Sequence, residues 1–103
     1  MPWGSPWFYP FTEASVILNA ADGSGVYAFH GTHVLHGAQT YIFLGETKNI
    51  RAQLIQHLRA NDPCMALFRD LTFSYELVAP VALSLRWAEL VRELRPVCNE
   101  RWA

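Results

Sequence analysis

The alternation of hydrophobic and polar residues predicts two strands, a helix, a third strand and a final helix. Residues 25–30 and 39–44 read as strands, because β-branched and aromatic side chains alternate over short runs. The link over residues 31–38 is short and holds two glycines, so we expect a loop that joins an antiparallel hairpin. Gly45 follows the second run and is expected to end that strand in a tight turn.

An amphipathic helix is expected after Gly45, ending near Ala60. Its apolar residues recur at helical spacing, namely Ile50, Leu54, Ile55 and Leu58. Thr47 or Asn49 would accept a hydrogen bond from the first free amides of this helix. The Asn-Asp-Pro run at residues 61–63 cannot continue it.

Two later segments complete the predicted fold. Residues 71–78 alternate cleanly, which predicts a half-buried third strand. Residues 81–94 are expected to form the last long helix, ended by Pro96, with an apolar stripe of Leu83, Trp87, Leu90, Val91 and Leu94. The order of elements predicts an α/β fold in which helices pack on a small sheet.

The N-terminal residues 1–11 form an aromatic, proline-containing arm, and residues 12–103 are expected to form a single domain. The arm either packs over the core of its own domain or offers a surface for a protein partner or a homodimer. Residues 12–20 predict a short helix capped by Thr12, although Val16 and Ile17 leave a strand as the rival interpretation.

The composition narrows the class of protein. Hydrophobic residues make up 51% and charged residues 17% of 103, which indicates a folded chain. The formal net charge of -1 argues against strong non-specific binding to nucleic acid, but Lys48, Arg51 and Arg59 are expected to lie together as a local basic face for it.

The compartment is predicted from what the sequence lacks. No signal peptide and no apolar run of membrane-spanning length is apparent, so we expect a cytoplasmic protein that does not act at a membrane. The two cysteines, Cys64 and Cys98, are too few for a disulfide framework and are expected to be reduced, partly buried thiols.

Four short motifs follow one another in a recognisable order. GVY at residues 25–27 precedes FLG at 43–45, a polar-faced helix that ends near a histidine, and a final helix that runs into RPVCN at 95–99. Over roughly residues 24–99 the chain resembles the GIY-YIG nuclease domain. The resemblance implies a three-stranded antiparallel sheet flanked by helices, and phosphodiester hydrolysis with a divalent metal such as Mg or Mn. The closing asparagine of the family is matched by Asn99.

The resemblance implies catalytic roles for three residues. Tyr27 matches the tyrosine of the first motif, His57 a histidine at the end of the motif helix, and Glu89 the glutamate that holds the metal. Each residue also has an ordinary structural interpretation. Tyr27 suits a strand aromatic, His57 a helix end, and Glu89 a surface ion pair with Arg86 or Arg92.

Two positions depart from the family pattern. Phe43 replaces the tyrosine of the second motif, and Gln53 stands where the helix arginine is expected. Loss of one preorganised donor costs about a hundredfold or more in rate. We therefore expect a nuclease-like domain with a degraded site that binds nucleic acid or protein. Two alternatives stay open: an active metal-dependent DNA endonuclease, and an interaction module without nucleic acid.

A histidine-rich stretch offers a second candidate site. His30, His33 and His36 are spaced by three residues across a strand end and a loop. Imidazole suits zinc, so two or three of them could converge on a metal. No cysteine or carboxylate lies nearby in the sequence, and solvent-exposed loop histidines are the ordinary interpretation.

Overall fold

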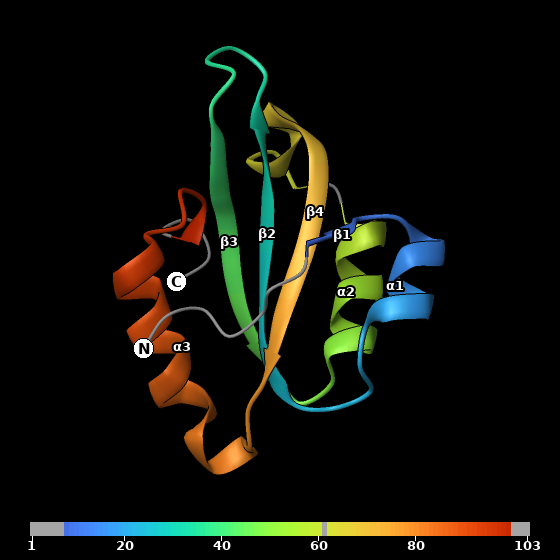
Figure 1. Ribbon diagram of the computed structural model, residues 1–103, viewed down its shortest axis with the longest axis vertical. Helices are drawn as coiled ribbons and strands as arrows, with labels where there is room; N and C mark the ends of the chain where they lie inside the picture. The colour runs from blue at the N-terminus through green and yellow to red at the C-terminus, as the bar shows by residue number, and fades with distance from the viewer. Residues whose placement is uncertain (1–7, 61, 100–103) are drawn as a thin grey trace.

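An antiparallel sheet with the strand order β1-β4-β2-β3 forms the centre of the protein (Figure 1). The computed structural model describes residues 8–60 and 62–99. The three long strands are β2 (Gly25–His33), β3 (Gln39–Thr47) and β4 (Phe68–Leu77). The two-residue strand β1 (Tyr9–Pro10) adds to the outer edge of β4, opposite Phe73 and Thr72. The predicted α/β fold is therefore confirmed, with this short fourth strand added to the sheet.

Helices cover both faces of the sheet (Figure 1). Helices α1 (Glu13–Asn19) and α2 (Ile50–Arg59) lie on one face, and α3 (Leu83–Leu94) lies on the other. The central strand β2 contributes to both hydrophobic cores, because its side chains alternate between the two faces. No helix in the described part of the chain is long and apolar enough to cross a bilayer.

The predicted helices form for the expected local reasons. The Thr12 side chain accepts a hydrogen bond from Ser15 N at 3.2 Å and caps α1, so the rival strand interpretation is wrong. Asn49 caps α2 by accepting from Ala52 N at 3.0 Å. The last helix begins two residues later than predicted, at Leu83, because residues 80–82 form a 3₁₀ turn that opens with a proline.

Two predicted turns are wrong because the strands continue through them. β2 extends to His33, so the hairpin loop is shorter than the predicted residues 31–38. Gly45 does not end β3, which runs on to Thr47, and it pairs with Tyr27 instead. The glycine is needed there for space rather than for a turn.

The third strand is longer than predicted and less regular. β4 begins at Phe68 rather than at residue 71, and a 3₁₀ turn at Met65–Leu67 precedes it. Asp70 has a positive φ of 54°, and the pairing with β2 shifts between His30 and Thr32. An extra residue accommodated in one strand of a pair in this way is a β-bulge.

The residues after α3 cover the free edge of β3. The N–H of Val97 donates to Tyr41 O at 3.2 Å, and the N–H of Cys98 donates to Ile42 O at 2.7 Å. The side-chain amide of Asn99 continues this pairing, since it accepts from Leu44 N and donates to Leu44 O, both at 2.8 Å. The segment 97–99 thus satisfies backbone groups that a sheet edge would otherwise expose.

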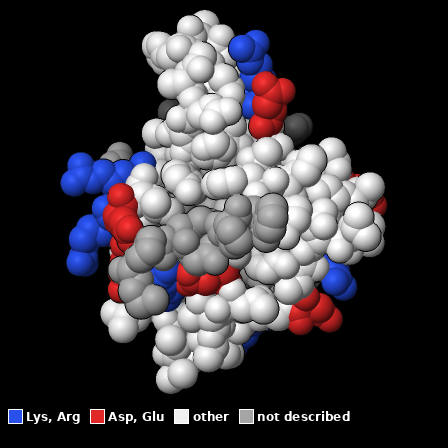
Figure 2. Space-filling model, viewed as in Figure 1, with Lys and Arg blue, Asp and Glu red and all other residues white. Residues whose placement is uncertain are grey.

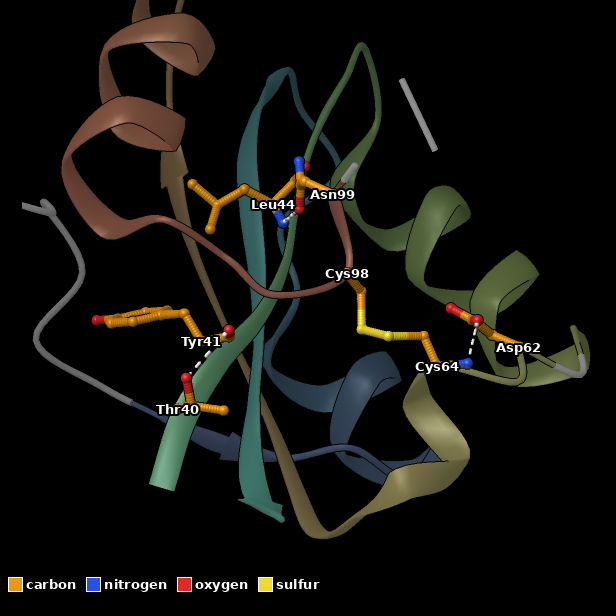
Figure 3. The surroundings of a disulfide bond; sticks show 7 residues. All are labelled: Thr40, Tyr41, Leu44, Asp62, Cys64, Cys98 and Asn99. Carbon is orange, nitrogen blue, oxygen red and sulfur yellow. Dashed lines mark hydrogen bonds between the residues drawn. A yellow bond between two sulfur atoms is a disulfide. The ribbon is translucent and has the colours of Figure 1, made fainter. Parts of the chain in front are cut away.

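The expectation of two reduced thiols is wrong, because Cys64 and Cys98 form a disulfide (Figure 3). They are 34 residues apart in sequence, which hides the pairing from a spacing argument. Cys64 follows α2 and Cys98 follows α3, so the bond ties the chain after one helix layer to the segment that covers the β3 edge.

Reduction of this disulfide is expected to lower the free energy of unfolding by about 2–4 kcal/mol, because the unfolded chain regains the freedom of a long loop. Urea unfolding with and without a thiol reductant measures the difference. The double variant Cys64→Ser/Cys98→Ser is the control, and its unfolding should not respond to the reductant. A wild-type curve that is equally insensitive, or two titratable thiols in the denatured, unreduced protein, would contradict the bond.

Candidate functional site

Tyr27 lies against Gly45 at the centre of the candidate site. The two residues are partners across β2 and β3, and the Tyr27 side chain is buried. A Cβ atom added at Gly45 would lie 2.3 Å from both Cζ and the hydroxyl of Tyr27. The missing side chain at position 45 therefore makes room for the tyrosine ring.

The hydroxyl of Tyr27 meets the imidazole of His57, with 2.8 Å between the oxygen and Nε2. Burial raises the pKa of Tyr27 well above its usual range, and a hydrogen bond with Gln53 only partly offsets this. Burial lowers the pKa of His57, against a smaller opposing effect of Asp62. Near neutral pH the phenol therefore keeps its proton beside a neutral imidazole, and the tautomer of His57 decides which of the two donates.

A cavity of about 410 Å³ opens beside Tyr27, between β3 and α3. The sheet contributes Tyr27, Phe43, Leu44, Gly45 and Glu46 to its lining, and Ser84, Trp87, Ala88 and Asn99 complete it. We call this cavity the aromatic pocket. It brings residues of both three-residue motifs and the closing asparagine to one place.

The indole of Trp87 is held against the strand that lines the aromatic pocket. Its Nε1–H donates to Leu44 O at 2.9 Å, the same carbonyl that accepts from Asn99. Sequence reasoning assigned Trp87 to the apolar stripe of the helix and missed its place in the pocket. The helical spacing of Ser84, Trp87 and Ala88, which share one side of α3, carries that signal.

Glu89 does not line the aromatic pocket. Glu89 is two residues after Trp87 on α3, so its side chain lies about 200° around the helix axis from that of Trp87. Its carboxylate is paired with Arg86, which also donates to Glu76 Oε1 of β4 at 2.7 Å. These residues line a different groove, and they match the surface ion pair that was the ordinary interpretation of Glu89.

The fit of the aromatic pocket to a divalent metal is poor. Mg²⁺ and Mn²⁺ prefer carboxylate and other oxygen ligands. The described residues that line the pocket include one carboxylate, Glu46, whose Oε1 accepts from the hydroxyl of Ser84 at 3.1 Å. Throughout residues 8–60 and 62–99, no three His, Cys, Asp or Glu side chains gather as a metal site would require.

The predicted histidine site is only partly assembled. The rings of His33 and His36 stack with their centroids 4.4 Å apart at the hairpin. His33 Nδ1 accepts from the backbone amides of Leu35 and His36, at 3.1 and 3.3 Å. His30 lies farther along β2, against Phe8 and Tyr41. These contacts describe a structured turn more closely than a zinc centre.

The three basic residues expected to form one face have separate surroundings. The guanidinium of Arg51 donates to Ala20 O through Nε at 3.1 Å and Nη2 at 2.9 Å, so it ties α2 to the end of α1. Lys48 precedes α2 and Arg59 ends it, and a helix of that length spans about 15 Å. On the face shown in Figure 2, basic side chains lie at the margins beside acidic ones rather than in one broad patch.

The chain is similar in sequence to bacterial excinucleases. It is 29% identical over 94 residues to excinuclease Cho of Escherichia coli K12 and to the excinuclease Cho proteins of E. coli O157:H7 and Shigella flexneri. The match covers 90% of this chain but spans only 30% of the length of those relatives. No protein-family model matches the chain, and no solved structure matches it.

The close approach of Tyr27 to position 45 predicts that Gly45→Ala lowers the free energy of unfolding by about 1–3 kcal/mol, through overpacking. Gly23→Ala is the matched control, since a Cβ there would meet Leu77 Cδ2 at an ordinary 3.7 Å. Urea unfolding compares both variants with the wild type. Equal stability of Gly45→Ala and the wild type would contradict the contact.

The buried imidazole of His57 predicts a loss of stability below about pH 6.5. Because its pKa is lowered in the folded protein, the unfolded chain binds more protons as the pH falls through that range. His57→Gln should therefore reduce the fall in unfolding free energy between pH 7 and pH 5. Some pH dependence should remain, because burial also lowers the pKa of His30.

The exposed His36 provides the control for this pH series. The variant His36→Gln makes the same chemical change outside the core. If His57→Gln and His36→Gln gave the same curve, the imidazole of His57 would not resist protonation in the folded state.

Proposed function

We propose that this chain is a GIY-YIG nuclease-like domain that binds nucleic acid and has lost efficient phosphodiester hydrolysis. The similarity to excinucleases and the order of the motifs support the nuclease-like class. The observation that carries the loss of hydrolysis is the position of Trp87. It supplies an indole on the α3 side of the aromatic pocket, while the carboxylate of Glu89 is paired with Arg86 in another groove.

Three side chains of the proposed site lack the groups that cleavage needs. A nuclease stabilises the charge that builds on the phosphate oxygens with a metal, guanidinium groups or hydroxyl donors. Phe43 offers a phenyl ring and Gln53 an amide, and neither carries a positive charge. Trp87 adds a third neutral group, so little remains in the described part of the pocket to stabilise that charge.

An active endonuclease is the second candidate function, and the contact between Tyr27 and His57 favours it. At 2.8 Å, a neutral imidazole could take a proton from the phenol or from a water in its place. A metal ion, Mg²⁺ or Mn²⁺, would then have to be held by Glu89 or by another carboxylate. Glu89 would have to leave Arg86 to reach the aromatic pocket.

An interaction module without nucleic acid is the third candidate, and an exposed apolar surface favours it. Leu77, Val81 and Leu85 are 60%, 96% and 77% exposed around the start of α3. The aromatic arm is a weaker candidate for a partner or dimer surface. Tyr9 and Phe11 pack against the core of their own chain, and Trp3 and Trp7 lie outside the described residues.

The proposed function predicts binding without cleavage. Plasmid, single-stranded and branched DNA should each remain intact with Mg²⁺ or Mn²⁺, at protein concentrations that retard them in a gel. The wild type and Glu89→Ala should behave alike. Nicking by the wild type that disappears in Glu89→Ala or Tyr27→Phe would establish the active endonuclease instead.

The same gel assay tests the exposed basic side chains. Lys48→Glu/Arg59→Glu should weaken DNA binding by about tenfold at low salt, because each lysine or arginine near a phosphate releases counterions on binding. Arg69→Glu, at the exposed start of β4, is the control and should have a smaller effect. If no DNA is retarded under any condition, the interaction module becomes the better account.

A further inference from the structure

We propose that the aromatic pocket binds an unpaired nucleobase that carries an exocyclic amino group, such as cytosine or adenine. This inference rests on the proposed function, because it names the part of a nucleic acid that the pocket would hold.

The lining suits a flat aromatic ring. The half-buried indole of Trp87 lines the cavity from α3, and the buried rings of Tyr27 and Phe43 reach it from the opposite face of the sheet. Its volume of about 410 Å³ lies within the range of small-molecule sites. Trp87 is fixed in place through the hydrogen bond of its Nε1–H to Leu44 O. An immobilised ring stacks on a base without losing further side-chain freedom, and such stacking is tolerant of sequence.

The negative charge of the pocket disfavours the binding of a phosphate. Its described lining residues include no lysine, arginine or histidine, and their one charged group is the carboxylate of Glu46. An anion in the pocket would meet like charge without a cation to compensate it. A neutral base that brings an N–H₂ donor meets an acceptor instead, as a carboxylate accepts from the amino group of cytosine.

The other polar side chains that line the pocket are paired within the protein, so Glu46 and Ser84 are the side chains that can select the ligand. The amide of Asn99 is paired with the backbone of Leu44, and the hydroxyl of Tyr27 is paired with His57. The hydroxyl of Ser84 donates to Glu46 Oε1 at 3.1 Å and so orients the exposed carboxylate. Discrimination among bases therefore depends mainly on what Glu46 can accept.

The test compares short single-stranded oligonucleotides of abasic sugar-phosphate units that carry one central cytosine, one central thymine or no base. The cytosine oligonucleotide should bind about tenfold more tightly than the abasic one, the scale of one stacked base. Thymine should fall between them, because it stacks but has no amino group. Fluorescence anisotropy at fixed salt measures all three affinities.

Two variants assign the effect to the aromatic pocket. Glu46→Gln should remove most of the preference for cytosine over thymine, since its carboxamide both donates and accepts. Glu93→Gln, the same change at an exposed position of α3 outside the pocket lining, is the matched control and should keep that preference. Trp87→Phe should reduce the advantage of both bases over the abasic site.

Nuclear magnetic resonance titration with free cytidine separates failure of this inference from failure of the proposed function. Cytidine should shift the backbone amides of Gly45 and Glu46, and thymidine should shift them less. If all three oligonucleotides bind equally and cytidine shifts neither amide, the base pocket is wrong while DNA binding stands. If cytidine binds there and no oligonucleotide does, the pocket stands and the proposed function is wrong. If neither binds, both are overturned.

Discussion

The backbone of Leu44 is the point on which the arrangement of the site depends. β3 lies at the edge of the sheet, and its outward N–H and C=O groups need partners. Asn99 supplies both from one side-chain amide, and Trp87 adds a second donor to the same carbonyl (Figure 3 shows Asn99 beside Leu44). Satisfying one edge residue therefore fixes the last helix, the segment after it and the wall of the aromatic pocket.

Gly45, the residue after Leu44, adds a second constraint, which comes from a missing side chain rather than from a hydrogen bond. Gly45 contributes no side chain, and the ring of Tyr27 occupies the space that a Cβ atom would need. The ring then extends to His57 of α2, on the face of the sheet opposite α3. Two consecutive residues of β3 thus help to position both helix layers. The backbone of Leu44 binds Trp87 of α3, and the missing side chain of Gly45 leaves room for the Tyr27 ring that contacts α2.

Much of the fold could be predicted because it follows from local patterns. Helix periodicity and capping located α1 and α2 from their own residues, and alternation located the long strands. The role of Gly45 could not be predicted from neighbouring residues. A glycine is required there because the ring of Tyr27, in another strand, occupies the space of a Cβ atom. The disulfide was missed for a similar reason, since Cys64 and Cys98 are 34 residues apart in sequence and are brought together by the folded structure.

The candidate site was predicted in part. The motifs single out Tyr27 and His57, and the two are neighbours because their relative positions follow from one strand pair and one helix. The choice between Trp87 and Glu89 depends on how α3 is rotated on the sheet. An amphipathic pattern shows which broad side of the helix faces the sheet but not the precise rotation about its axis. Two residues along a helix differ by about 200° in direction, so the pattern alone does not decide which of the two side chains lines the pocket.

The position of the disulfide decides what a single protease cut would do to the molecule. A cut between residues 65 and 97 leaves two polypeptides that stay covalently joined through sulfur. Without a reductant they remain one molecule, heavier only by the water that hydrolysis adds. A cut at the exposed tip of the hairpin, at residues 34–38, lies outside that covalent loop. The two pieces would then be held by strand pairing and core contacts alone, and they would part on denaturation.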